Sequence, residues 1–196
     1  QQKLHCANYG RNNCRPEGNK AVARLSYIED ATSDDVKDLA ECISAQRGGS
    51  LPNLFKMLLH SPNVAQGWFD FLSATRKETI LDARTREFVI LYVAILLRAA
   101  YPKNDHVPIA LKEGITQDEI DQLASWRSSN LYDRRDKALL AYVEESSQDV
   151  QVSDDVFEML RQEYGDREVV ELTVLIGAYH MVARFLEALK IDLEPS

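Results

Sequence analysis

The chain has 196 residues, of which 45% are hydrophobic and 28% charged, and its formal net charge at pH 7 is −8. This composition is typical of one soluble globular domain that is long enough to bury its own core. The negative charge argues against nucleic acid or an anionic membrane as a partner, and the longest apolar run, residues 88–97, is about half the length of a membrane span.

The first 20 residues are polar and lack an apolar period, so we predict an N-terminal arm over residues 1–20 and a helical domain over residues 21–196. Cys6 and Cys14 in this arm are expected to be free thiols. A disulfide between them is the alternative, and together with the Gln1 start it would suit a secreted chain. We therefore expect a cytoplasmic protein and keep secretion open. Cys42 lies in a helical pattern and is expected to be buried as a small apolar residue.

Helical periodicity begins near residue 32. Thr32 or Ser33 can cap a first helix, which Gly48-Gly49 would end. Apolar residues recur through 54–59, and Ser61-Pro62 then begins another helix with proline in its first turn.

Asp82 is expected to cap the next helix, whose residues 88–97 are apolar nearly all round. Such a helix should be central and buried. The β-branched residues of this run would also suit a strand, but its length and the lack of a second strand-like run favour a helix.

The remaining elements are also predicted to be helices. Thr116 and Glu119 have the spacing of a capping box for a short helix that follows Gly114. Three longer helical segments are expected at residues 133–147, 154–164 and 166–189. The predicted fold class is an all-α, single-domain helical bundle.

Glu87 and His106 are the first candidate catalytic residues, because a carboxylate and an imidazole are well suited to moving a proton near neutral pH. Residues 98–105 could turn the chain back, so that two adjacent helices bring both side chains into one pocket. Each residue also has a structural interpretation. His106 could simply bond a neighbour at a helix start, where Asp105 would be the cap, and Glu87 could pair with a nearby arginine at the surface.

Metal and cofactor motifs are not evident in the sequence. The four histidines lie far apart, and there is no His-x-x-x-His pattern or clustered Cys/His. There is also no glycine-rich phosphate loop and no Gly-x-Ser-x-Gly motif. We therefore expect neither a metal nor a cofactor.

Four segments in order carry a resemblance to a known family: 47–62 (RGGSLPNLFKMLLHSP), 84–91 (RTREFVIL), 106–116 (HVPIALKEGIT) and 171–184 (ELTVLIGAYHMVAR). Over about residues 28–193 the chain resembles the carboxymuconolactone decarboxylase family, which shares its fold with the alkyl hydroperoxidase D-like proteins. The resemblance implies a helical bundle of that type, assembled as a homo-oligomer with pockets near the subunit contacts.

The resemblance also implies roles for individual residues. His106 falls at the position of the family's histidine and would be the general acid or base, and Glu87 has the spacing of the relay glutamate of the hydroperoxidase branch. Tyr101 would donate a hydrogen bond to a developing oxyanion.

Three further residues are candidates for binding a substrate. Lys103 could bind a substrate carboxylate, although a lysine is usually solvated. His180 and Arg184 lie four residues apart and so share one face of a helix that could line the pocket.

The chain departs from its relatives at two motifs. The Cys-x-x-Cys pair of the hydroperoxidase branch falls on Ala99 and Pro102, which disfavours thiol peroxidase chemistry. Decarboxylase-like relatives carry Tyr-Glu-Trp, where this chain has Tyr101-Pro102-Lys103. The function expected is cofactor-independent decarboxylation or isomerisation of a small lactone, keto acid or aromatic-derived acid. The alternative is a non-catalytic small-molecule binder or interaction module with the same fold.

Overall fold

The computed structural model describes residues 23–29 and 33–194, and in these residues it contains helices and no strands. The all-α prediction is therefore confirmed. Thr32 and the predicted arm with Cys6 and Cys14 lie outside the described residues.

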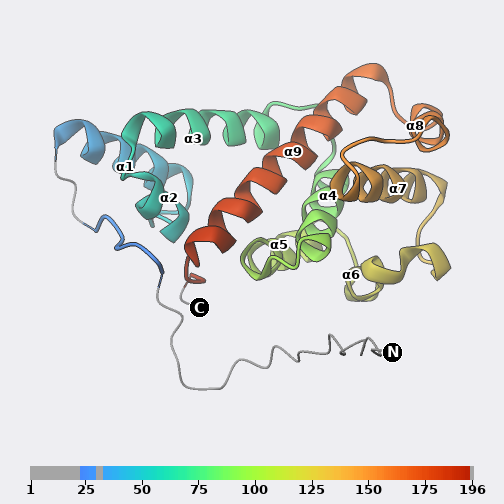
Figure 1. Ribbon diagram of the computed structural model, residues 1–196, viewed down its shortest axis with the longest axis horizontal. Coiled ribbons are helices and arrows are strands. Elements are labelled where there is room, and N and C mark those ends of the chain that lie inside the picture. The colour runs from blue at the N-terminus through green and yellow to red at the C-terminus, as the bar shows by residue number, and fades with distance from the viewer. Residues whose placement is uncertain (1–22, 30–32, 195–196) are drawn as a thin grey trace, which may run out of the picture.

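Three helices form one end of the molecule: α1 (Asp34–Gln46), α2 (Asn53–Leu58) and α3 (Pro62–Lys77). The other elements are α4 (Ala83–Leu96), α5 (Ala100–Lys112), α6 (Gln117–Gln122), the 3-10 helix η1 (Leu123–Ser128), α7 (Arg134–Gln148), α8 (Asp154–Arg161) and α9 (Asp166–Leu189). Figure 1 shows α9 crossing the molecule diagonally, with α1, α2 and α3 on one side and α7 and α8 on the other.

Polar caps begin several helices where the sequence predicts them. Asp82 accepts hydrogen bonds from the Thr85 backbone N–H and hydroxyl at 2.8 Å. Thr116 and Glu119 form the complete capping box at the start of α6. These side chains satisfy backbone N–H groups that have no partner within the helix.

α4 is the central helix of the bundle. Its side chains from Glu87 to Ala94 are all buried, and it packs against α5, α7 and α9. Period-3.6 burial on one face would leave half of these residues exposed, whereas neighbours on several sides bury an apolar helix all round. The helical prediction for residues 88–97 is confirmed as far as Leu96.

The buried side chains form two clusters, and α9 contributes to both. The first cluster surrounds α4 and α7 and includes Leu172 and Tyr179 of α9. The second joins α1, α2 and α3 to Val182 and Leu186 of α9, and it also contains Tyr101 of α5. The boundary between these clusters passes through α5 and α9, where the candidate site lies.

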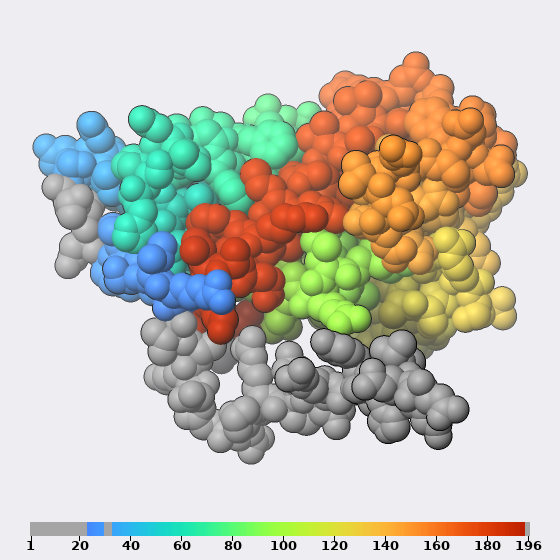
Figure 2. Space-filling view, in the orientation of Figure 1, coloured from blue at the N-terminus to red at the C-terminus, as the bar shows by residue number. Residues whose placement is uncertain are grey.

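α9 also stands out by its composition. It is long and apolar enough to match a membrane span, but half of its most apolar 18-residue window is buried within the protein, as in a core helix. Figure 2 shows that one side of α9 stays on the surface between α3 and α7.

Two local predictions are wrong. Cys42 is exposed, because the buried face of α1 is formed by Val36, Leu39 and Ile43, and Cys42 falls beside that stripe. Asp105 does not cap the helix containing His106, since α5 begins at Ala100 and both residues lie within it.

Candidate active site

A tight turn sets α5 against α4. Arg98 adopts the left-handed conformation with φ of 54°, and the Ala99 N–H bonds the Ala94 carbonyl at 2.9 Å. This six-residue closure ends α4 in a Schellman-type cap and reverses the chain. α5 therefore returns along α4, and a residue near the start of α4 can meet a residue in the middle of α5.

Glu87 and His106 meet in this way. Glu87 Oε2 lies 2.6 Å from His106 Nδ1, and the two residues are 4% and 6% exposed. Water and salt weaken contacts between charged groups at the protein surface, whereas this contact is shielded from both. The sequence prediction that the two residues lie together is borne out in this geometry.

Tyr179 of α9 is the third member of the group. Its hydroxyl lies 3.2 Å from His106 Nε2, and the two rings meet edge to face with centroids 5.3 Å apart. Burial raises the pKa of the Tyr179 hydroxyl to about 12, so it remains a neutral hydrogen-bond donor at physiological pH.

For a neutral His106 beside an ionised Glu87, these contacts fix the tautomer: the Nδ1–H donates to the carboxylate, and Nε2 accepts from the Tyr179 O–H. Nε2 is the nitrogen left free of Glu87, and His106 and Tyr179, which meet at Nε2, both line a pocket. His106 is therefore arranged as a proton acceptor whose protonated form Glu87 would stabilise.

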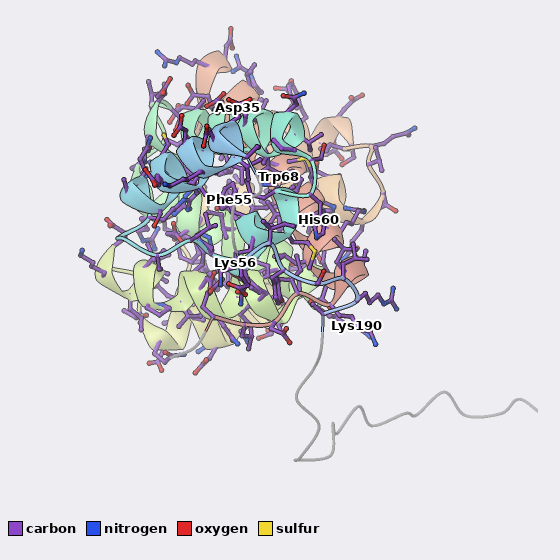
Figure 3. The ribbon with its side chains drawn as sticks, turned by 90° about the vertical axis from the view of Figure 1, so that its left-hand side faces the viewer. Asp35, Phe55, Lys56, His60, Trp68 and Lys190 are labelled. Atoms are coloured by element: carbon purple, nitrogen blue, oxygen red, sulfur yellow. The ribbon has the colours of Figure 1, made fainter. Side chains whose placement is uncertain are left out.

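His106 and Tyr179 line a pocket with about 500 Å³ of free space, part of it open to solvent. Its wall combines apolar and charged side chains from four helices and the loops beside them: Arg47, Pro52, Leu54, Phe55, Leu72, Arg76, Tyr101, Pro102, Asp105, Val182 and Leu186. Figure 3 faces the end of the molecule formed by α1, α2 and α3, where Phe55 is labelled. The mixed apolar and charged character of this wall suits a small organic molecule.

Tyr101 lines the same pocket, but its hydroxyl donates to the Glu194 carboxylate of the C-terminal segment. Burial raises the pKa of Tyr101, and the bond to Glu194 adds to that shift. The Tyr101 O–H is therefore already bonded to Glu194. The hydroxyl at hydrogen-bond distance from His106 is that of Tyr179.

The three residues expected to bind substrate do not line this pocket. Lys103 is exposed on α5. Arg184 donates to His180 Nδ1 at 2.7 Å, and burial together with Arg184 lowers the pKa of that imidazole. The predicted helix face thus brings His180 and Arg184 together, away from His106.

The sequence interpretation overlooked Tyr179, Arg47 and Arg76. Tyr179 carried a usable signal, because it continues the buried stripe Leu172, Leu175 and Ile176 at helical spacing and has a polar tip. Arg47 and Arg76 end two different helices, and nothing in their local sequence relates them to His106.

The described residues provide neither a cysteine in the pocket nor a cluster of metal ligands. Ala99 is buried, Pro102 lines the pocket, and Cys42, the cysteine within the described ranges, is exposed on α1. No group of three or more His, Cys, Asp or Glu side chains is placed to hold a metal ion in residues 23–29 and 33–194.

Comparison with known proteins relates this geometry to a family. Residues 62–145 match the model of the carboxymuconolactone decarboxylase family. The uncharacterized protein YnjA of Escherichia coli (strain K12) is 26% identical over 148 residues, covering 74% of this chain and 76% of that protein.

Solved structures extend the likeness over most of the chain. The alkylhydroperoxidase AhpD core of an uncharacterized peroxidase-related protein from Ralstonia eutropha JMP134 superposes with a TM-score of 0.74 at 18% identity, covering 88% of this chain and 92% of that one. The debrominase Bmp8, solved as an alanine variant with 2,3,4-tribromopyrrole, gives a TM-score of 0.71 at 16% identity, with 90% and 92% covered. At these identities the likeness establishes the fold.

Proposed function

Since residues 62–145 match the carboxymuconolactone decarboxylase family and the chain has the alkyl hydroperoxidase D-like fold, we propose that it is a cofactor-independent acid–base enzyme acting on a small molecule. The observation that carries the proposal is the buried 2.6 Å contact between Glu87 and His106, in which the second nitrogen of the histidine stays free of Glu87 and the histidine lines a pocket. The reaction class is proton transfer at a substrate carbon, leading to decarboxylation or isomerisation of a lactone or keto acid.

The proposed reaction uses His106 Nε2 as the base. A carbon-bound proton next to a carbonyl moves to Nε2, and the electron pair left behind delocalises onto the carbonyl oxygen. Glu87 stabilises the imidazolium through Nδ1–H, and return of the proton to another carbon completes an isomerisation. In a decarboxylation the substrate carboxylate leaves as CO₂ instead, and the resulting carbanion takes a proton from the imidazolium form of His106, which has first taken that proton from solvent.

Tyr179 is proposed to donate a hydrogen bond to the developing oxyanion. In the free enzyme its hydroxyl bonds His106 Nε2, so a bound substrate would take over this donor as it takes over the base. A neutral donor aimed at the oxyanion strengthens as charge develops there. This role replaces the one expected for Tyr101, whose hydroxyl is bonded to Glu194.

Among the described residues no cysteine lines the pocket, which supports acid–base rather than thiol chemistry. The positions that carry cysteine in the hydroperoxidase branch hold Ala99 and Pro102, and neither can form a thiolate. The glutamate–histidine pair would then act directly on the substrate.

The test is turnover on a panel of lactones and β-keto acids, followed by CO₂ release and by proton NMR in deuterated water. Wild type should turn over at least one compound, or exchange its acidic C–H for deuterium. The proposal expects His106→Ala to lower the rate by about 10²- to 10⁴-fold, the usual contribution of a general base. Glu87→Gln should also lower it, with the helical fold retained by circular dichroism.

His60→Gln is the matched control, because His60 bonds the Ser26 carbonyl at 2.7 Å and does not line the pocket. Equal activity of wild type and His106→Ala would overturn the proposal. Ligand binding that persists in His106→Ala, without turnover or exchange in wild type, would instead favour the non-catalytic small-molecule binder.

A further inference from the structure

Two arginines, Arg47 and Arg76, lie in the wall of the pocket that contains His106. Arg47 follows the last turn of α1, and Arg76 is in the last turn of α3. A hydrogen bond of 3.2 Å from Lys77 to Gln46 joins these helix ends, so the neighbouring arginines come from adjacent backbone positions. Both side chains are half-buried.

Neither guanidinium has a carboxylate partner within 4.0 Å among the described residues. Six other arginines of the described ranges do form such ion pairs: Arg84, Arg127, Arg134, Arg135, Arg161 and Arg167. Of the described arginines outside such ion pairs, Arg47 and Arg76 are the two that line the pocket.

The surroundings hold Arg47 in place without neutralising it. Its guanidinium carbon lies 5.6 Å from the centre of the Phe55 ring, a cation–π distance. Burial lowers the pKa of Arg47, and the positive charge of Arg76 lowers it further, which places the two guanidinium groups within electrostatic range of each other. Two like charges in a half-buried wall repel, and an anion between them would relieve that repulsion.

Other charges near the pocket do not replace such an anion. Asp105 lines the pocket at its exposed side, beyond ion-pair distance of either arginine, and partial burial raises the pKa of its carboxyl group. Glu87 is bonded to His106 Nδ1 and does not line the pocket. Two arginines therefore line the cavity, and Asp105 is the carboxylate beside them in the lining.

We propose that Arg47 and Arg76 together bind the carboxylate of an anionic substrate and hold it so that its reactive carbon faces His106. This inference rests on the proposed function for its catalytic meaning and adds the group that the pocket recognises. Guanidinium groups bind carboxylates with two parallel N–H···O bonds, so a pair of them fixes both the position and the orientation of a small acid. The substrate class is then a small organic acid anion rather than a neutral lactone.

The test compares ligands of equal shape and different charge. Acetate with acetamide, and benzoate with benzamide, are titrated into the wild-type protein by NMR at low salt. In at least one pair the anion should bind at least about tenfold more tightly than the amide, because a hydrogen bond to a charged group contributes more than one to a neutral group. Added sodium chloride should weaken the anion and leave the amide unchanged.

Variants assign that selectivity to the two side chains. Arg47→Gln and Arg76→Gln should each reduce it, and Arg76→Lys should retain part of it because lysine keeps the charge and loses the paired N–H geometry. Arg167→Gln is the matched control, since Arg167 pairs with Glu171 and does not line the pocket. The lack of any preference for the anion in both wild-type pairs would overturn the proposal, and so would a preference that survives both glutamine variants.

His106→Ala separates this inference from the proposed function. It should keep the preference for the anion, because the arginines are unchanged. Loss of turnover in His106→Ala without any anion preference in wild type would leave the acid–base proposal standing and remove the arginine site. Anion preference in wild type without turnover or exchange would leave the arginine site standing and remove the acid–base proposal.

Discussion

His106 Nδ1 lies 2.6 Å from Glu87 Oε2, although the residues are 19 positions apart and belong to different helices. The contact depends on the turn at Arg98, which directs α5 back along α4. It fixes one nitrogen of the imidazole and leaves the other free of Glu87.

Tyr179→Phe should retain the fold and lower the proposed activity. The phenyl ring can keep the edge-to-face packing on His106, and only the 3.2 Å hydrogen bond is removed. We expect the rate constant of the best panel substrate to fall by about tenfold or more, as for loss of one donor to an oxyanion. The stability should decrease by about 1 kcal/mol, measured by urea unfolding. An unchanged rate would remove Tyr179 from the mechanism.

Arg84→Met should destabilise the protein by about 2–3 kcal/mol, measured by urea unfolding, because it removes the partner of two nearly buried carboxylates. Arg84 bonds Asp136 and Glu119 at 2.7 Å, and these residues are 6% and 8% exposed. Because Arg84 is itself partly exposed, the loss of stability should be smaller than for a fully buried ion pair. In Arg167→Met the exposed pair with Glu171 is lost, and the cost should stay below about 1 kcal/mol. Equal costs for the two variants would contradict this account.

Glu119 should make the free energy of unfolding depend on pH in the acidic range. Burial alone would raise the pKa of its carboxyl group, but hydrogen bonds from Thr116 and from Arg84 outweigh burial and lower it below the ordinary value of 4.5. A carboxyl group with a lower pKa in the folded state stabilises the fold above that ordinary value, and its contribution is lost as the pH falls. The free energy of unfolding of wild type should therefore decrease below about pH 4.5 more steeply than that of Glu119→Gln. Parallel curves for the two proteins would show that Glu119 is not responsible.

Arg98→Gly should stabilise the turn between α4 and α5 by about 0.5–1 kcal/mol, because the left-handed conformation costs a non-glycine residue about that much. Arg98 is exposed and has φ of 54°. Arg98→Val should have the opposite sign, since a β-branched side chain fits this conformation poorly. Urea unfolding of both variants tests the pair, and a stabilising valine would contradict the assigned conformation.

Pro102→Cys should create a reactive thiol. Position 102 lies in the first turn of α5 and lines the pocket, four residues before His106 on the same helix. A helix start and a neighbouring imidazole both favour a thiolate, so the pKa of the new thiol should lie below the ordinary value of about 8.5. In a background with Cys6, Cys14 and Cys42 changed to serine, the pH dependence of iodoacetamide alkylation measures it. Titration at or above that value would show that the pocket does not activate a thiol.

The sequence was sufficient for the helices and for the resemblance to the family. Caps at Asp82 and Thr116 depend on residues close in sequence, and the family match over residues 62–145 contains two of the four motifs that carry the resemblance. The Glu87–His106 contact was predictable for a similar reason, since a single turn joins the two helices.

The rest of the pocket depends on packing between distant parts of the chain. Tyr179 is 73 residues from His106, and the ends of α1 and α3 that carry Arg47 and Arg76 meet because these two helices pack against each other. Tyr101 is predicted from the sequence to donate to an oxyanion, but its hydroxyl bonds Glu194, which lies 93 residues away. Cys42 was expected to be buried because its local pattern is helical, but a helical pattern does not state which face a single residue occupies.

The position of the pocket between two hydrophobic clusters has a consequence for local unfolding. Glu87 and His106 belong to the helix pair α4 and α5, whereas Arg47 and Arg76 come from the cluster of α1, α2 and α3. Transient local unfolding of α1, α2 and α3 would open the pocket and expose His106 to water, while the contact with Glu87 persists. A bound ligand that touches both sides would oppose this unfolding, so amide hydrogens of α1 and α3 should exchange more slowly in its presence, and those in the centre of α4 should hardly change.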